Sequence, residues 1–211
     1  MKRRTFLMTG AAIGTLAATA AQAQMHGTPA VNAGDGTPMQ FMPKKPKDAT
    51  PLQNELEKYA KCPYCGMDRK DYHFSRHLIH YSDDLVDGTC SIHCAAISLS
   101  LNLDRSPKAI YAPDNSAADD IKPLVEVEKL TYVIGGGLKP VMSKVAKTSF
   151  SSKEWAAAIV AKEGGETADF NKALTLAYAN MAEDTMQIRK NREERRKKMM
   201  EQGGAMEHKA H

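Results

Sequence analysis

The sequence of 211 residues has no repeat of fixed period and no apolar run long enough for a membrane helix. Its weakly apolar stretch near the start, residues 9–20, is shorter than the about 20 residues that such a helix needs. The lack of a repeat excludes a solenoid. We therefore expect a globular domain rather than a repeat array or a membrane span.

Motifs of common nucleotide-binding and catalytic sites are also missing. Gly135-Gly136-Gly137 is followed neither by the Gly-Lys-Ser/Thr of a phosphate-binding loop nor by a helical pattern. The sequence offers no context for a Ser-His-Asp triad. Because nothing in the sequence requires catalysis, we predict that the protein is not an enzyme.

Cysteine is scarce, and all four cysteines lie in two short clusters, Cys62-Pro63-Tyr64-Cys65-Gly66-Met67 and Cys90-Ser91-Ile92-His93-Cys94. Thiolate, imidazole and thioether are ligands that soft metals prefer, Cu(I) above all, while zinc accepts thiolate and imidazole. We therefore predict a site for Cu(I), with zinc as the alternative metal. The predicted ligands are Cys62, Cys65, Met67, Cys90, His93 and Cys94.

The spacing within each cluster predicts how its side chains converge. Pro63 and Gly66 favour a tight, irregular loop that turns its sulfur atoms toward one point. Cys90 and Cys94 are one helical turn apart at the start of a predicted helix, whose N-terminus favours thiolates. His93 is offset by about 100° from Cys94, so a buried, hydrogen-bonded histidine remains an equal interpretation. Three further histidines are interpreted as strand or surface residues rather than ligands: His73, His77 and His80.

Other interpretations of the cysteines stay open. In an exported protein, Cys62–Cys65 and Cys90–Cys94 can be disulfides. Four thiolates can also form a closed zinc site that only holds the loop to the helix, although such a site does not need Met67. The third alternative is a thiol-dependent enzyme, but a redox Cys-x-x-Cys normally opens a helix, and Gly66 leads into no helical pattern.

The first 23 residues have the features of a cleavable export signal: a basic start, a short apolar core and Ala21-Gln22-Ala23. The adjacent Arg3 and Arg4 favour the twin-arginine class, whose cargo crosses the membrane folded, over an ordinary Sec signal. No cysteine directly follows the signal, so we expect no lipid anchor. The predicted mature protein is periplasmic and begins near Gln24.

Charge is nearly balanced outside the C-terminal end. Residues 1–23 hold three of the 29 basic residues and none of the 25 acidic ones, which leaves a net charge of +1. Residues 189–200 hold seven basic and two acidic residues, so the rest of the mature chain is slightly acidic. We therefore expect no nucleic-acid partner and no stable membrane anchor. The basic run is interpreted as a solvated helix end, with partner binding as the alternative.

We predict four segments: an export signal at 1–23, a flexible lead-in at 24–51, a metal-binding domain at 52–180, and a basic helical tail with a disordered end at 181–211. The fold class is α+β, a single small domain of two β-β-α-like halves followed by a long basic helix. The expected strands and helices in chain order are strands at 74–81 and 85–89, a helix from Ser91 to Leu103, strands at 109–111, 125–127, 131–134 and 146–150, a helix from Ser151 or Ser152 to Ala161, an edge strand at 166–169 and a helix at 171–198.

The first cluster and the residues after it resemble the NosL family of periplasmic copper-binding accessory proteins, which assist maturation of nitrous-oxide reductase. The resemblance covers roughly residues 61–173 and is most specific at Cys-Pro-x-Cys-Gly-Met. It implies Cu(I) held by Cys65 and Met67 with Cys62 beside them. It also implies that the partner is a recipient cuproenzyme or its assembly machinery. The downstream matching residues are Lys139-Pro140-Val141-Met142, Phe150, Trp155 and Gly164-Gly165.

The chain also departs from that family pattern. Met142 matches a methionine that the family places before a glycine, but Ser143 follows it here. Family members are typically lipoproteins, whereas this chain looks like soluble twin-arginine cargo. Cys90-x-x-His93-Cys94 lies outside the core motif and resembles metal-binding modules of metallochaperones. The family fold is similar to that of organomercurial lyases, which makes an enzyme the rival hypothesis.

Overall fold

The computed structural model describes residues 45–103 and 105–207, with side chains through residue 201. The predicted export signal, residues 24–44 of the predicted lead-in and residues 208–211 lie outside this range. The elements in chain order are α1 (Glu55–Lys58), β1 (His77–Tyr81), β2 (Val86–Thr89), α2 (Ile92–Leu101), β3 (Pro107–Pro113), β4 (Leu124–Glu126), the 3-10 helix η2 (Val127–Lys129), β5 (Thr131–Ile134), β6 (Lys147–Phe150), α3 (Lys153–Glu163), β7 (Glu166–Ala168) and α4 (Phe170–Glu207).

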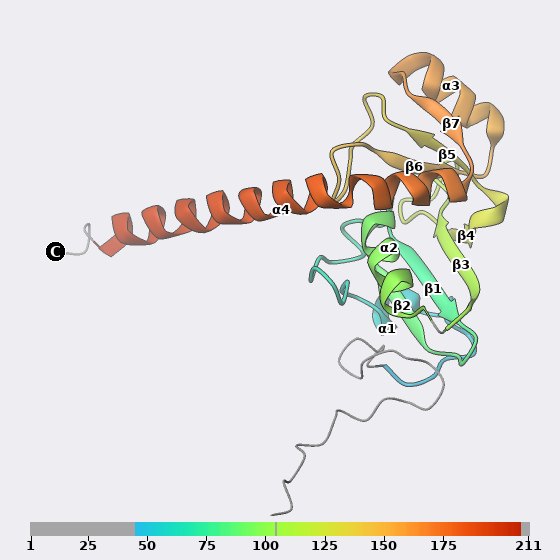
Figure 1. The fold of residues 1–211 in the computed structure, drawn as a ribbon, viewed down its shortest axis with the longest axis horizontal. Coiled ribbons are helices and arrows are strands. Elements are labelled where there is room, and N and C mark those ends of the chain that lie inside the picture. The colour runs from blue at the N-terminus through green and yellow to red at the C-terminus, as the bar shows by residue number, and fades with distance from the viewer. Residues whose placement is uncertain (1–44, 104, 208–211) are drawn as a thin grey trace, which may run out of the picture.

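Helices pack with two antiparallel sheets, so the predicted α+β class is confirmed. The first sheet has the strand order β2-β1-β3-β4 and the second has the order β6-β5-β7. Figure 1 shows the two sheets on opposite sides of α4, which crosses the domain and then extends away from it. The described residues include no helix long and apolar enough to cross a membrane.

The first sheet is built on the predicted strand–turn–strand. Asp84 takes a φ of 63° in the turn, and the carboxylate of Asp83 accepts the Leu85 amide at 3.2 Å. The first strand starts at His77 rather than residue 74, because residues 74–76 form turns: the amide of Arg76, for example, donates to the Tyr72 carbonyl at 3.0 Å. The strand expected at 125–127 lies at Leu124–Glu126 and pairs with β3, so it completes the first sheet instead of opening the second half.

The second sheet depends on glycines that bring two loops together. Gly136 has a φ of 68°, and a Cβ there would lie 2.4 Å from the carbonyl oxygen of Gly164. The glycine run therefore allows close packing against the end of α3. Ser152 caps α3 by accepting the Trp155 amide at 3.1 Å, as predicted. The predicted edge strand is confirmed as β7, which pairs with β5.

The main core joins both sheets to α2 and α4. Ala173 and Ala177, one turn apart on α4, are buried in the same cluster as Ala95 and Ala96 of α2. Small side chains at these positions let the two helix backbones approach closely. Burial on α4 continues to Asp184, inside the segment predicted as the tail, whereas residues 189–201 are all exposed. The first half of α4 is therefore part of the domain.

One buried arginine ties the segment after the first cysteine cluster to the first sheet. Arg69 is fully buried and forms an ion pair with Glu55 at 2.7 Å. Its guanidinium also donates to the backbone carbonyls of Tyr59 at 2.7 Å and Thr89 at 3.2 Å. A Cβ at Gly88 would lie 2.9 Å from this guanidinium, so glycine is needed there for the close approach.

Candidate metal centre

The first cysteine cluster forms a loop that closes on itself. The Cys62 amide donates to the Met67 carbonyl at 2.9 Å, and the Gly66 amide donates to the Cys62 carbonyl at 2.8 Å. Gly66 has a φ of 78°, in the left-handed region that favours glycine, while a Cβ there would meet nothing within 4 Å. Glycine therefore serves the backbone turn, which directs the loop's sulfur atoms inward.

The second cluster joins the end of β2 to the start of α2. Cys90 follows the strand directly, and Cys94 lies in the first turn of the helix. Ser91 occupies the predicted N-cap position with extended backbone angles, but its side chain makes no capping hydrogen bond. The Sγ atoms of Cys90 and Cys94 are 3.7 Å apart, so strand end and helix start present two thiols to one point.

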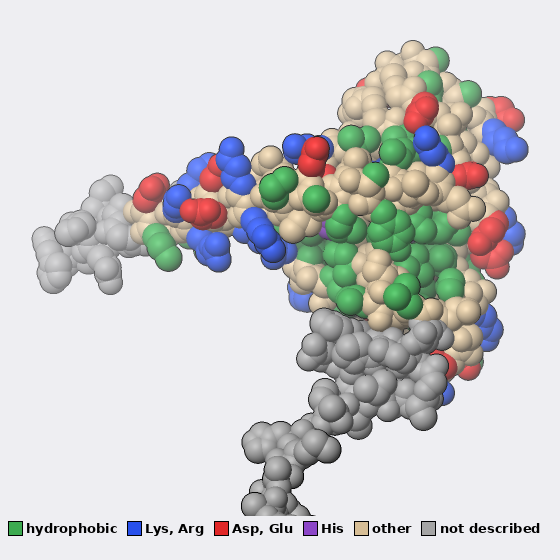
Figure 2. All heavy atoms as spheres, in the orientation of Figure 1, with side chains coloured by type: hydrophobic (Ala, Val, Ile, Leu, Met, Phe, Trp, Pro, Cys, Tyr) green, Lys and Arg blue, Asp and Glu red, His purple; other side chains and the backbone are tan. Residues whose placement is uncertain are grey.

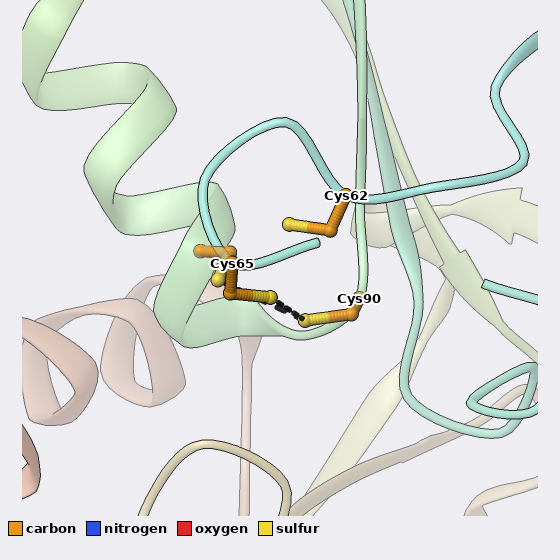
Figure 3. A group of neighbouring side chains, drawn as sticks. Cys62, Cys65 and Cys90 are labelled. Atoms are coloured by element: carbon orange, nitrogen blue, oxygen red, sulfur yellow. Dashed lines mark hydrogen bonds between the residues drawn. The ribbon is translucent and has the colours of Figure 1, made fainter. Parts of the chain in front are cut away.

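The fold brings the two cysteine clusters together at one point. The Sγ atoms of all four cysteines lie within 4.8 Å of one another, and all four are free thiols. Figure 3 shows the labelled cysteines converging from the loop and from the end of β2; the Sγ atoms of Cys65 and Cys90 are 3.3 Å apart. The Sδ atom of Met67 lies 3.9 Å from Cys90 Sγ. Sequence reasoning thus identified a set of sulfur atoms that the fold brings together.

Access to the sulfur cluster is one-sided. Cys62, Cys90 and Cys94 are buried, whereas Cys65 is only partly buried. Met142 packs against the cluster together with the rings of Tyr64 and Tyr72. Its φ of 55° is uncommon for a residue other than glycine, so the backbone takes a strained conformation beside the thiols. An incoming soft ligand would reach the cluster at Cys65.

The four thiols share their protons unequally. Hydrogen bonds from Cys65, Cys90 and Cys94 hold the pKa of Cys62 far below its usual range. The bond to Cys62 raises the pKa of Cys65, but the bonds from Cys90 and Cys94 outweigh it, so that pKa is also lowered. Bonds to Cys62 and Cys65, together with burial, raise the pKa of Cys90 and Cys94. A metal ion would displace the remaining protons as it bound.

His93 lies beside the thiols but its ring is directed at α4. Its Nδ1 atom is 3.7 Å from a carboxylate oxygen of Asp184, and both side chains are buried. Burial lowers the pKa of His93 despite the opposing effect of Asp184. Within the described part of the chain, the group of ligand atoms that meet at one point comprises the four cysteines and not His93. The other carboxylate oxygen of Asp184 accepts the Lys144 amide at 3.0 Å.

The three histidines interpreted as strand or surface residues have protein partners away from the cluster. The Nε2 atom of His77 lies 3.1 Å from the Tyr132 hydroxyl. The Nε2 atom of His80 lies 2.9 Å from the Asp84 carboxylate. The Nδ1 atom of His73 accepts the Lys122 amide at 3.3 Å. Burial, the largest effect, lowers the pKa of His77 to about 4. These contacts agree with a structural interpretation of all three.

Sequence reasoning missed a buried carboxylate that holds the cysteine loop. The Tyr64 hydroxyl donates to Asp87, and the Ser98 hydroxyl donates to the same carboxylate at 2.7 Å. Burial raises the pKa of Asp87 in spite of these two donors. Tyr64 is the variable residue of Cys-Pro-x-Cys, so this contact fixes the loop to β2 and α2. The only sequence signal is an acidic residue inside the predicted strand at 85–89.

An α+β domain in which a loop and a helix start gather four thiols around one point is a soft-metal-binding domain. The NosL family model matches residues 53–175, more than half of the chain, so the protein belongs to the NosL family. It is also similar to the crystal structure of the copper chaperone NosL from Shewanella denitrificans, with 21% sequence identity, a TM-score of 0.44, and coverage of 60% of this chain and 96% of that one. No curated protein matches the sequence.

Proposed function

We propose that this NosL-family protein is a periplasmic copper chaperone that binds Cu(I) at the cysteine cluster and delivers it to a cuproenzyme such as nitrous-oxide reductase. The observation that carries the proposal is the meeting of four thiol sulfurs with the Met67 thioether at one partly open point. Thiolate and thioether together form a soft donor set, which suits Cu(I) better than it suits zinc.

Delivery requires that an acceptor can invade the site. Cys65 is the accessible thiol, and it lies in a loop rather than in a helix or strand, so ligand exchange can begin there without unfolding the domain. Met142 supplies a second thioether beside the cluster. We propose that these thioethers hold copper while its thiolate ligands are exchanged one by one for those of the recipient.

The geometry also supports a second candidate, a structural zinc site. In a tetrahedral site with Zn–S bonds of about 2.3 Å, the sulfur atoms lie about 3.8 Å apart. The separations of 3.3 Å for Cys65–Cys90 and 3.7 Å for Cys90–Cys94 are close to that value. A zinc-stabilised scaffold therefore remains the main competitor. A thioredoxin-like redox role is less favoured, because Cys62 and Cys65 lie in a turn and open no helix.

Metal preference separates the copper carrier from the scaffold. The periplasmic form is purified anaerobically, and its bound metal and free thiols are counted. Affinities for Cu(I) and for zinc are then measured by chelator competition in the wild type and in Met67→Leu. The matched control is Met200→Leu, since Met200 is 75% exposed on α4.

We expect Met67→Leu to weaken Cu(I) binding and leave zinc binding nearly unchanged, because a thioether contributes only to the soft ion. The control variant is expected to bind both metals as the wild type does. Equal losses for the two metals in Met67→Leu, or zinc that fills the site and resists exchange, would favour the scaffold instead.

A further inference from the structure

The distal part of α4 projects from the body of the domain. Every described side chain from residue 189 to residue 201 is exposed, and Figure 2 shows basic groups gathered along the projecting helix. This segment spans about 20 Å at the usual rise per helical residue. The projecting surface is therefore large enough to contact another molecule.

Arginines and lysines occupy different sides of this segment. With about 100° between successive residues, the arginines fall within one third of the helix circumference. We name this side the arginine face; it consists of Arg189, Arg192, Arg195 and Arg196. The glutamates and lysines lie around the rest of the helix, where Lys197 pairs with Glu193 at 2.9 Å. Among the described side chains, no carboxylate lies within ion-pair distance of an arginine of this face.

One arginine of this face contacts the loop of the metal centre at its partly exposed cysteine. Arg195 continues the side of α4 on which Ala177 and Asp184 face the domain, because it lies about five and about three helical turns from them, and Arg192 is offset from that side by about 60–80°. The guanidinium of Arg192 donates to the backbone carbonyl of Cys65 at 3.4 Å. Any molecule that approaches the partly buried Cys65 therefore meets the Arg192 guanidinium beside the loop.

We infer that the arginine face is the docking surface for the copper acceptor, and that this acceptor is a protein presenting carboxylates next to its own soft copper ligands. The inference rests on the proposed chaperone function. Guanidinium groups bind carboxylates through paired, charge-assisted hydrogen bonds. Residues 24–188 hold 18 basic and 21 acidic residues, so the rest of the mature chain would repel an acidic acceptor weakly and leave this face as the attractive one.

An anionic membrane fits the same face less well. A helix that lies on a membrane carries a broad apolar side opposite its basic side. Between residues 189 and 201, Met199 and Met200 are the only apolar residues. A phospholipid surface also offers no ligand that could take copper from Cys65. The contact between the arginine face and the metal loop therefore points to a protein acceptor.

The test uses the full mature protein loaded with Cu(I) and two synthetic acceptor peptides. Both peptides have the same methionine-rich copper-binding centre, which is flanked by aspartates in one and by asparagines in the other. The variant Arg192→Gln/Arg195→Gln/Arg196→Gln is compared with the equally charged control Lys190→Gln/Lys197→Gln/Lys198→Gln. Copper loading is measured first, and transfer rates are then measured at low and at high ionic strength.

We expect the wild type to transfer copper to the aspartate peptide at least about tenfold faster than to the asparagine peptide at low salt, as electrostatic steering does elsewhere. The preference disappears in the arginine variant and at an ionic strength of about 1 M, where charges are screened within about 3 Å. The lysine control retains most of it. Equal losses in the two variants would show an effect of net charge alone and overturn the docking assignment.

Three further outcomes would also overturn the inference. A wild type that holds copper but transfers it equally to both peptides has no docking preference for carboxylates, while the chaperone function survives. Arginine-dependent binding to phosphatidylglycerol vesicles without any peptide preference would assign the face to a membrane. Failure of the wild type to hold Cu(I) would instead refute the proposed function, and the docking inference with it.

Discussion

Replacement of Arg69 by methionine tests how the metal loop is anchored to the fold. The change removes a fully buried cation, its ion pair with Glu55, and its hydrogen bonds to backbone carbonyls of Tyr59, Thr89 and His77. Glu55 keeps one partner, because Arg76 lies 2.8 Å from its other carboxylate oxygen. Breaking a buried pair costs about 3–5 kcal/mol, and Arg76 limits the uncompensated charge. We therefore expect a loss of about 3 kcal/mol, a large part of the about 5–15 kcal/mol typical of a domain.

Equilibrium unfolding in urea, with the metal-free protein under reducing conditions, measures this loss. Arg195→Met is the matched control, since Arg195 is exposed on α4 and should change stability by less than about 0.5 kcal/mol. Arg69→Lys keeps the charge but not the fork of donors, and is expected to lie between the two. A loss for Arg69→Met no larger than that of the control would refute the view that this side chain anchors the loop.

Three further predictions concern the loop, the core and copper release. Tyr64→Phe removes a donor from the buried Asp87 carboxylate and should cost about 1.5–3 kcal/mol in thermal or urea unfolding; Tyr72→Phe, at a ring that packs against the same cluster, should cost less. The pKa of His77 is lowered from 6.5 to about 4, so the unfolded state binds the proton first as the pH falls. We therefore expect the folded protein to lose about 3 kcal/mol of stability between pH 6.5 and pH 4. His77→Gln should remove that part of the pH dependence, and an unchanged pH profile of this variant would contradict the assignment. For Cys65→Ser and Cys94→Ser, the loss in the rate of copper transfer to an external chelator is divided by the loss in copper affinity. We expect this ratio to be larger for Cys65→Ser, because Cys65 is the accessible thiol. Equal ratios for the two variants would show that the chelator reaches the copper at another ligand.

The order of strands and helices could largely be predicted from the sequence because its signals are local. The Ser82-Asp83-Asp84 turn between two apolar stretches defines the first hairpin, and Gly164 ends α3 where the pattern of apolar residues ends. Partner choice between strands is not local. Residues 125–127 follow a long connection, and nothing in their composition distinguishes pairing with β3 from pairing with β5.

The sulfur cluster was predictable for a similar reason. All four cysteines of the chain lie in the two clusters. These clusters flank the short hairpin of β1 and β2, whose antiparallel pairing brings its two ends together. The residues that support the cluster were not predictable. Arg69 belongs to no motif of the sequence, and Asp184 lies in the segment predicted as the basic helical tail. Their burial depends on contacts with α1 and with α2 respectively, which single-sequence patterns do not encode.

The second cysteine pair changes how the proposed copper carrier would hold its metal. The family-like loop by itself offers Cys62, Cys65 and Met67 on a surface turn, an arrangement that would leave copper open to solvent. Cys90 lies within 4 Å of sulfur atoms from both the loop and the helix, so it closes the buried side of the cluster. The accessible side then consists of Cys65 and the arginine of α4 that contacts its carbonyl. Under the proposed chaperone function, such a site would hold a soft ion from within and expose one ligand to exchange, so that release would depend on the acceptor that reaches Cys65 and less on spontaneous dissociation.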